Sequence, residues 1–347
     1  MTTATHRQAG MTLIEMMIAL VLGLVVVGAA SAVFLSNKQA YTTNSALSEI
    51  QSNARIAYEL LARDLRQAGL AGCGDANRVA NVLTNGPNAS ATPAWWADFA
   101  QNAIRGYDGS QTDPAVTTGG ASGQRVTGTS SIELIGADEP TVATGAPNAT
   151  NTSYTVDASA AGQFAEGNIA IICNPDHATI AQVTGTSATT IDFTHAGNNC
   201  SDGLGFPTDC TDPTPCSTSG AASIGASCYQ FPSNSQISLL SANTWYIGNN
   251  AQGGTSLYRQ TLTTSTNAPA LATQEMVRDV TNMQLRYLVG TDTDYSTAAD
   301  VTTGNNWARV SAVRIDLTMR SGAERAGSEQ QPLSRTLSSI IALRNPA

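Results

Sequence analysis

The chain contains few charged residues, and it lacks the residue patterns of common catalytic sites. Only 12% of its 347 residues are charged, lysine occurs once, at Lys38, and the formal net charge is −9. Without a cluster of cations there is no patch to neutralise phosphates, so nucleic-acid binding by this chain alone is not expected. The nucleophile-elbow, HExxH and Walker patterns are missing, and His177 and His195 lie in polar stretches typical of surface loops. We therefore predict neither an enzyme nor a cofactor.

Proline is absent from a long N-terminal stretch. None occurs from Met11 to Gly69, and only Gly23 and Gly28 interrupt a series of good helix formers. The sequence therefore predicts one helix over residues 11–66, about 84 Å long at 1.5 Å per residue. The glycines that begin at Gly69 end this helix.

The second half of the predicted helix has one apolar face. Apolar residues recur at steps of three and four: Leu47, Ile50, Ala54, Ala57, Leu61, Leu65 and Ala68. Such a stripe packs against a sheet or another helix. The opposite face is polar, and Glu59 and Arg63 have the spacing of an i,i+4 ion pair. A plain anchor followed by a separate amphipathic helix is the alternative.

The first half of the helix is long and apolar enough to cross a membrane. Twenty residues from Met16 to Leu35 lack any charge, and Glu15 stands directly before them. A carboxylate in hydrocarbon is unfavourable by about 2.5–3.5 kcal/mol, and such residues are functional by default. A secretory signal has a shorter apolar core with its small-residue cleavage site after it. Here Gly10 precedes the apolar run, so cleavage beside it leaves the hydrophobic segment on the mature protein.

The sequence GMTLIE at residues 10–15 resembles the class III leader of type IV pilins and type II secretion pseudopilins. The resemblance implies that a prepilin peptidase cuts between Gly10 and Met11 and methylates the new N-terminus. It also implies that Glu15, the fifth residue of the mature chain, is the assembly glutamate of the family. A signal anchor with an incidental glutamate is the alternative.

Physical chemistry favours the same role for Glu15. An unpaired carboxylate in lipid either takes up a proton or pairs with a cation. The free amine of Met11 lies one helical turn away, on the same chain or on a docking neighbour. A neighbour's amine meets Glu15 only when subunits associate. The unfavourable burial in the lone subunit therefore becomes a driving force for polymerisation.

After the helix, short runs of β-branched and aromatic residues separated by turn residues predict strands. These runs are 132–135, 168–173, 179–183, 237–240, 244–247, 256–260, 277–289, 310–317 and 336–343. Val313, Ile315 and Leu317 share one face of their strand. Short strands after one long helix indicate an α+β fold with mainly antiparallel sheet. We expect a leader at 1–10, a transmembrane and polymerisation half of the helix at 11–36, an amphipathic half at 37–69, and a periplasmic β-rich domain at 70–347.

Later segments resemble minor pilins of the PilW type. They are the glycine- and cysteine-bearing helix end at 68–73, IRGY at 104–107, VRDVTNMQ at 277–284 with Tyr287, WARV at 307–310 with residues 313–314, and the ending 335–345. This resemblance is patchy, whereas that of the leader and helix is continuous. It implies the type IV pilin fold, in which the long helix packs on an antiparallel sheet with long, disulfide-stapled loops.

The cysteines indicate disulfides and not a zinc site, because none forms a CxxC pair. They are Cys73, Cys173, Cys200, Cys210, Cys216 and Cys228. Four of them fall within residues 200–228, a polar stretch that cannot build a core and where a disulfide supplies stability. The even number predicts an oxidising compartment and no free thiol. We expect at least one bridge among the last four, and a Cys73–Cys173 bridge that ties the helix end to the sheet.

One group of aspartates raises the question of a cation site. Asp292, Asp294 and Asp300 lie near Gly290, and some related pseudopilins bind calcium. Their spacing misses the EF-hand pattern, so a solvated turn is the simpler interpretation. We predict no metal, with these three aspartates as the calcium candidates.

Together these features indicate a minor pilin. The resemblance implies a single-pass protein of the inner membrane with a periplasmic C-terminal domain, which moves into the pilus on assembly. It also implies a minor-pilin complex that primes or tips the pilus, with other minor pilins, the major pilin, a large tip adhesin and the prepilin peptidase as partners. A J-type pseudopilin of type II secretion shares the leader and helix but is usually shorter. A membrane-anchored periplasmic enzyme or binding protein is the alternative of another class.

Overall fold

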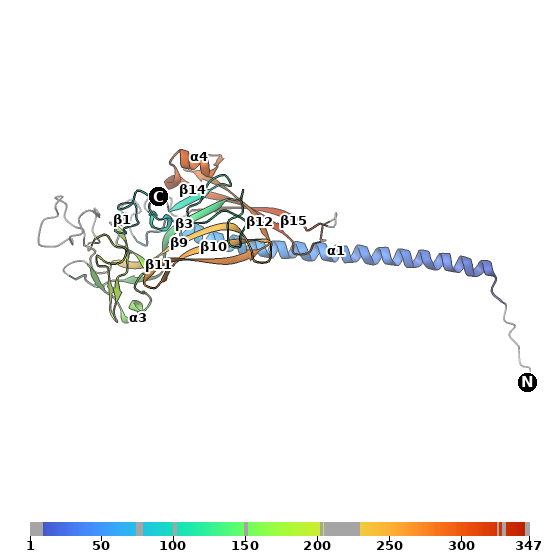
Figure 1. The fold of residues 1–347 in the computed structure, drawn as a ribbon, viewed down its shortest axis with the longest axis horizontal. Helices are drawn as coiled ribbons and strands as arrows, with labels where there is room; N and C mark the ends of the chain where they lie inside the picture. Colours follow the sequence, from blue (N-terminus) through green and yellow to red (C-terminus); the bar gives the residue numbers. More distant parts are fainter. Residues whose placement is uncertain are drawn as a thin grey trace, which may run out of the picture. The chain divides into compact units, whose positions relative to one another are not determined.

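The computed structural model describes residues 10–73, 79–99, 103–148, 152–201, 204, 230–324, 326–327 and 331–343. The chain divides into two units, Met1–Gln51 with Ser321–Ser334 and Ser52–Arg320 with Arg335–Ala347. The start of the predicted leader, and Cys210, Cys216 and Cys228 of the predicted disulfide loop, lie outside the described residues. Figure 1 shows the course of the chain from the N-terminal helix to the last strand.

A long helix, α1, runs over 55 residues from Leu13 to Gln67, as predicted. It ends where Gly69 adopts a left-handed conformation, with φ of +77°. The N–H of Gly69 donates to Ile135 O (2.9 Å), and the N–H of Ala137 donates to Leu70 O (2.6 Å). These two bonds join the end of the helix to strand β3 (Ser131–Ala143).

The apolar stripe on the second half of α1 is buried, as predicted. In the second unit its members are at most 2% exposed: Ala54, Ala57, Leu61, Leu65 and Ala68. Each fully buried leucine contributes about 1.5–3 kcal/mol by leaving water. The predicted ion pair of Glu59 with Arg63 is wrong. Glu59 pairs instead with Arg55, whose Nε lies 2.8 Å from Glu59 Oε1. Helical side chains lean toward the N-terminal turn, which brings Glu59 over Arg55.

The largest sheet of the described chain has eight strands. Its main path is β1 (Val79–Asn81), β6 (Ala178–Gln182), β5 (Ile169–Cys173), β9 (Gln236–Asn249), β10 (Thr255–Ser265) and β11 (Ala268–Arg278), and β2 (Ile104–Tyr107) is joined to it through β3. β9 is the centre of the sheet, because it pairs with β3 along one edge and with β5 and then β10 along the other. All these pairs are antiparallel except β1–β6.

A second, four-stranded sheet follows in the sequence (Figure 1). Its order is β13 (Tyr295–Ser296), β12 (Val280–Val289), β14 (Val310–Arg320) and β15 (Ser334–Ala342), and α4 (Ala298–Thr303) and the 3₁₀ turn η3 (Trp307–Arg309) connect β13 to β14. Val313, Ile315 and Leu317 are fully buried on one face of β14, as their alternation predicts. The opposite face carries polar side chains, among them Arg314 and Asp316, which pair at 3.2 Å.

The predicted strand over 277–289 is wrong in one respect, because the structure divides it between two sheets. β11 ends at Arg278, β12 begins at Val280, and Asp279 between them has φ of +61°. A left-handed residue turns the chain sharply, and aspartate tolerates this conformation better than most residues. The N–H of Asp279 donates to Thr255 O and its carbonyl accepts from the N–H of Arg320, which holds the turn in place.

Several short elements have little signal in the sequence. A third sheet of the described chain has the order β4 (Ser153–Thr155), β8 (Thr190–Asp192) and β7 (Gly185–Thr186), and α3 (Ala158–Ala161) and η2 (Trp95–Ala97) are single turns. These segments and β2 were not predicted, since two to four residues are too few to show a period. Both tryptophans of η2 are buried against β3, β5 and β6.

A disulfide joins Cys73, just after α1, to Cys173 at the end of β5. The bridge spans 100 residues of sequence and has a Cα–Cα distance of 5.6 Å. It is the pair expected from the sequence, and it ties the helix end to the sheet. Cys200 is disulfide-bonded as well, and the described part of the chain has no free cysteine. The predicted α+β class, with one long helix and mainly antiparallel sheet, is confirmed.

Candidate functional site

Glu15 lies in the first turn of α1, where it closes a capping box with Thr12. The N–H of Glu15 donates to Thr12 Oγ1 (3.3 Å), while Glu15 Oε2 accepts from the N–H (3.2 Å) and hydroxyl (3.1 Å) of Thr12. This arrangement satisfies backbone donors that the first turn leaves free, and it puts a negative charge at the positive end of the helix. The Thr-x-x-Glu spacing of Thr12 and Glu15 is the signature of a capping box and is visible in the sequence. In the sequence analysis Glu15 was given only a role in assembly.

The helix beyond Glu15 exposes its apolar side chains. From Leu13 to Leu35 the large apolar residues are 55–78% exposed. By length and composition this is a helix able to cross a membrane. A Cβ atom added at Gly10, Gly23 or Gly28 would meet nothing within 4 Å, so the described fold does not require glycine there. An apolar surface of this length requires lipid or other helices around it.

Asp64 lies on the buried face of α1, within the apolar stripe, and is 7% exposed. Its Oδ2 accepts from Nε1–H of Trp245 on β9 (2.8 Å) and lies 3.8 Å from Nη1 of Arg259 on β10. The Arg259 guanidinium also lies 5.7 Å from the centre of the Trp245 ring. Burial raises the pKa of Asp64, although the Trp245 hydrogen bond and the Arg259 charge oppose the rise. The cluster fixes the position of the second half of α1 on two strands.

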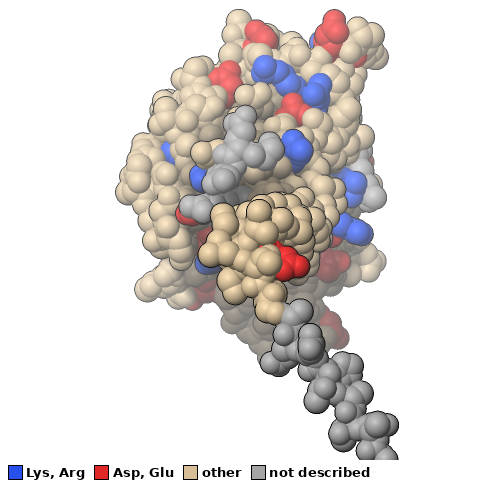
Figure 2. Space-filling model, turned by 90° about the vertical axis from the view of Figure 1, so that its right-hand side faces the viewer, with Lys and Arg blue, Asp and Glu red and all other residues tan. Residues whose placement is uncertain are grey.

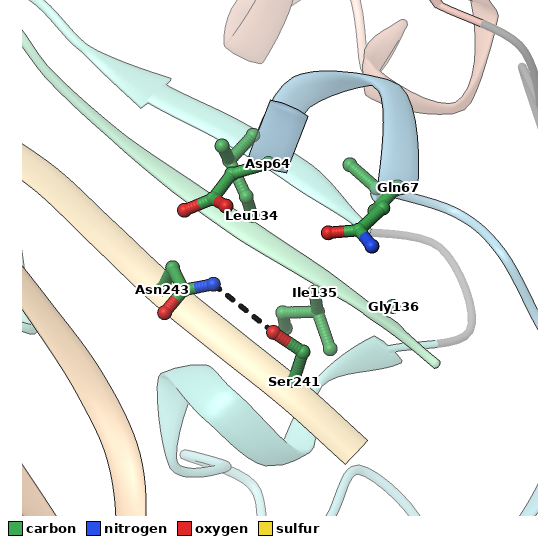
Figure 3. A pocket seen from close by; sticks show the side chains of 8 residues that line it. Asp64, Gln67, Leu134, Ile135, Gly136, Ser241 and Asn243 are labelled. Atoms are coloured by element: carbon green, nitrogen blue, oxygen red, sulfur yellow. Dashed lines mark hydrogen bonds between the residues drawn. The ribbon is translucent and has the colours of Figure 1, made fainter. Parts of the chain in front are cut away.

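A small cavity lies beside Asp64 at the end of α1 (Figure 3). Its volume is about 10 Å³, and it is lined by Asp64, Gln67, Ala68, Leu134, Ile135, Gly136, Ser241 and Asn243. That is roughly the space of one water, too small for a substrate. A Cβ at Gly136 would lie 2.3 Å from the carbonyl oxygen of Gln67, so glycine allows β3 to approach the helix this closely. The cavity belongs to the helix anchor.

Asp113 and Glu133 form a second buried polar group, which the sequence analysis missed. Ser131 Oγ donates to Asp113 Oδ2 (2.5 Å), and the Tyr107 hydroxyl donates to Glu133 Oε2 (3.1 Å). Burial is the main cause that raises the pKa of both carboxyls, and the neighbouring Asp113 raises the pKa of Glu133 further. Two neighbouring buried carboxyls favour the protonated form of one of them. We assign this pair a structural role, because the bond from Tyr107 to Glu133 joins β2 to β3.

The structure does not bring the calcium candidates together. Asp300 is in the first turn of α4, where its Oδ2 accepts from the N–H (3.2 Å) and hydroxyl (2.7 Å) of Thr297 in a capping box. The N–H of Asp292 donates to Val289 O in a turn. Within the described ranges, no three His, Cys, Asp or Glu side chains gather as a metal ion requires. The role that the structure shows for Asp300 is to begin a helix.

The fold and the helix define a class of protein. A long N-terminal helix with an exposed apolar half, followed by antiparallel sheets and a disulfide, is a pilin-like arrangement. The prokaryotic N-terminal methylation motif matches residues 5–31, which contain Gly10, Met11 and Glu15. The chain therefore has the N-terminus of a class III prepilin.

The second match is to a family of pilus-assembly proteins and lies in the C-terminal part of the chain. Residues 244–342 match the family described as Type IV Pilus-assembly protein W, PilW. The match begins within β9 and includes all of β10–β15, so it covers the whole four-stranded sheet. Residues 244–342 therefore carry a PilW domain, which belongs to a structural pilin family, and residues 5–31 carry the methylation motif. A comparison with curated proteins finds no match.

Proposed function

We propose that this chain is a minor pilin that joins a minor-pilin complex and primes or tips a type IV pilus. The observation that carries the proposal is Glu15 at the head of a helix whose apolar side chains are exposed from Leu13 to Leu35. In the lone subunit the carboxylate has Thr12 as its partner, and this contact leaves its charge uncompensated. A helix that only anchors the protein gains nothing from that charge.

Assembly supplies what the lone subunit lacks. Cleavage between Gly10 and Met11 creates an amine, and a neighbouring subunit can place its amine against Glu15 when the apolar helices pack together. Packing also covers the exposed apolar side chains, and Gly23 and Gly28 are small enough to let helices approach closely. Since the fold itself does not require glycine at position 10, recognition by the prepilin peptidase is the reason we assign to it.

The remaining roles follow from this proposal. Before assembly the chain lies in the inner membrane with its C-terminal domain in the periplasm, and afterwards it lies in the pilus. Other minor pilins, the major pilin and a large tip adhesin are its partners, and it is not an enzyme. Residues 1–10 are the leader, 11–36 the docking half of the helix, 37–69 the amphipathic half and 70–347 the periplasmic domain.

The capping box makes a sharp test possible. Glu15→Leu removes the charge and the side-chain half of the cap, whereas Glu15→Gln keeps a side chain that can close the box and removes the charge alone. If Glu15 pairs with a partner's amine, both variants should be cleaved and inserted normally but fail to co-purify with the other minor pilins. Pilus number should fall for both, since an uncompensated buried charge is unfavourable by about 3–5 kcal/mol.

Two further measurements complete the experiment. Mass spectrometry of the mature protein should find N-methyl-Met11 at its start, and Gly10→Ala should leave the precursor uncut. Thr12→Ala is the matched control, because it removes the hydroxyl of the cap and keeps the charge, and it should assemble nearly as the wild type does. Normal pilus number and co-purification with Glu15→Gln would show that Glu15 acts as a helix cap and would refute the assembly role.

A further inference from the structure

Strand β15 is the last strand of the four-stranded sheet, and one of its edges has no partner strand within the described residues. Two contacts fix its register on β14: Thr318 Oγ1 lies 2.9 Å from Thr336 Oγ1, and the N–H of Leu343 donates to Ser311 O (2.9 Å). In an antiparallel ladder, residues that bond to the neighbouring strand alternate with residues that face away. By this register the N–H and C=O groups of Thr336, Ser338 and Ile340 point to the open edge.

The side chains along this edge are exposed as well. Thr336, Ser338 and Ile340 are exposed, and the Ile340 side chain is 60% exposed, unusual for a large apolar residue outside the membrane helix. By the same register Ile340 stands opposite Arg314 of β14, which in turn stands opposite Arg286 of β12. One row across the sheet thus carries two arginines and an apolar residue, a composition typical of protein interfaces.

The charge of this sheet is opposite in sign to that of the whole chain. β12, β14 and β15 carry Arg286, Arg314, Arg320 and Arg335 but one carboxylate, Asp316, in a chain of net charge −9. Asp316 pairs with Arg314 at 3.2 Å, and Asp300 of α4 is held by its capping box. Arg286 and Arg314 are like charges directly opposite each other, which is unfavourable in an isolated sheet. Figure 2 shows Lys and Arg side chains, in blue, next to Asp and Glu side chains, in red, on the upper part of the face that it draws.

We propose that the open edge of β15 binds an extended, acidic segment of a partner protein, which adds to the sheet as a new outermost strand. The free N–H and C=O groups supply the hydrogen bonds, Ile340 supplies an apolar contact, and the arginine row attracts the carboxylates. A second copy of this chain is not the occupant, because edge-to-edge pairing would bring two sets of arginines together. The site includes neither Glu15 nor any other residue of the apolar half of α1.

The open edge of β11, the last strand on the main path of the eight-stranded sheet, is a natural control. There Glu275 pairs with Arg278 at 3.2 Å, so its charges are balanced. β10 and β11 meet in a two-residue turn at Thr266 and Asn267, and the pair that closes such a turn is hydrogen-bonded. Leu271, three residues beyond that pair, therefore directs its N–H to the open edge, as Ser338 does on β15.

The experiment uses the full-length protein in detergent micelles and a short fluorescent peptide of alternating valine and glutamate. Binding is followed by fluorescence anisotropy. A peptide with lysine in place of glutamate tests charge. A peptide N-methylated at every residue tests strand addition, because neither of its edges can donate a backbone N–H. The acidic peptide should bind at least about tenfold more tightly than either of these two.

Matched variants locate the site. Ser338→Pro removes one N–H from the open edge of β15 and leaves the hydrogen bonds between β15 and β14 intact. Edge strands tolerate such a proline, and the variant should bind the peptide about tenfold more weakly. Leu271→Pro makes the same change on the β11 edge and should leave binding unchanged. Arg314→Gln should weaken binding of the acidic peptide alone, and it keeps the proposal testable if Ser338→Pro does not fold.

Three results would overturn the proposal: equal binding of the acidic and lysine peptides, equal binding of the N-methylated peptide, or equal losses with Ser338→Pro and Leu271→Pro. Glu15→Leu should leave peptide binding unchanged. The edge site and the assembly role of Glu15 can therefore fail independently of each other.

Discussion

Leu24 and Leu61 lie on the same helix, α1, and yet one is 76% exposed and the other is fully buried. Near Leu61 the helix has one apolar stripe, and β-strands of its own chain cover it. Near Leu24 it is apolar on all sides, and within the described chain nothing covers it. The two regions have similar helix-forming residues and differ in the distribution of polar residues around the helix. That distribution decides whether a helix requires one packing surface or a surrounding medium.

The same helix also carries two carboxylates that differ in how their charge is satisfied. Asp64 has a tryptophan N–H and an arginine of its own chain close by. Within the described chain the hydrogen bonds to the Glu15 carboxylate come from Thr12, which supplies no positive charge. The comparison teaches that folding covers the second half of α1, whereas the first half stays uncovered within the described chain.

The largest effect should come from the buried stripe. Leu61→Ala should lower the free energy of unfolding by about 2–5 kcal/mol, because it removes buried apolar surface and leaves a cavity. Urea unfolding in detergent micelles, followed by tryptophan fluorescence, measures the change. Leu24→Ala is the matched control and should leave the unfolding midpoint of the C-terminal domain where it is. Equal losses from both substitutions would contradict the division of α1 into two regions.

A slightly smaller effect should follow from opening the Cys73–Cys173 bridge. Replacing both cysteines by serine should lower the free energy of unfolding by about 2–4 kcal/mol, since the bridge closes a loop of 100 residues. The same urea titration measures it. Addition of a reductant should lower the free energy of unfolding of the wild type by a similar amount. In the double variant the reductant should lower it only through the disulfide of Cys200. No loss in the double variant would mean that the helix end holds to the sheet without the bridge.

The smallest of these effects should be a change with pH at Asp64. Burial raises the pKa of Asp64 in the folded protein above its ordinary value of about 4. The folded state then binds the proton more tightly, so stability is greatest below that ordinary value and declines as pH rises through the folded pKa. Asp64→Asn should remove this part of the decline and keep an acceptor for Trp245.

The measurement for Asp64 is the difference between wild type and variant in a series of urea titrations across pH. Asp113 and Glu133 also have raised pKa values, but they contribute equally to both proteins and cancel in the difference. Wild type should lose stability relative to Asp64→Asn as pH rises above about 4. A constant difference across pH would mean that Asp64 does not titrate with a raised pKa.

Much of the fold was predictable because its signals are local. The absence of proline predicted α1, the three-and-four spacing predicted its buried stripe, and the alternation at Val313, Ile315 and Leu317 predicted the buried face of β14. β2, β4, β7 and β8 were missed because they are two to four residues long, and β2 and β4 pair with strands that are distant in sequence. The break at Asp279 was missed because a single left-handed residue leaves the pattern of apolar residues intact.

The candidate site divides in the same way. Gly10, Met11 and Glu15 are contiguous, so their motif could be read directly, and the Thr12–Glu15 cap was readable from the same letters. The cluster of Asp64, Trp245 and Arg259 could not be predicted, because Asp64 lies on α1 and the other two lie on β9 and β10. Asp64 and Trp245 are 181 residues apart in the sequence.

The sequence by itself determined the membrane-length helix, the processing motif, the sign of the net charge and the α+β class, because each depends on residues that are neighbours in the chain. The tertiary structure alone decided that an aspartate lies within the buried stripe, that β15 has an open edge, and that Arg286 stands opposite Arg314. The first two depend on how the helix and strands pack together, and the third depends on strand register, which a shift by one residue would change.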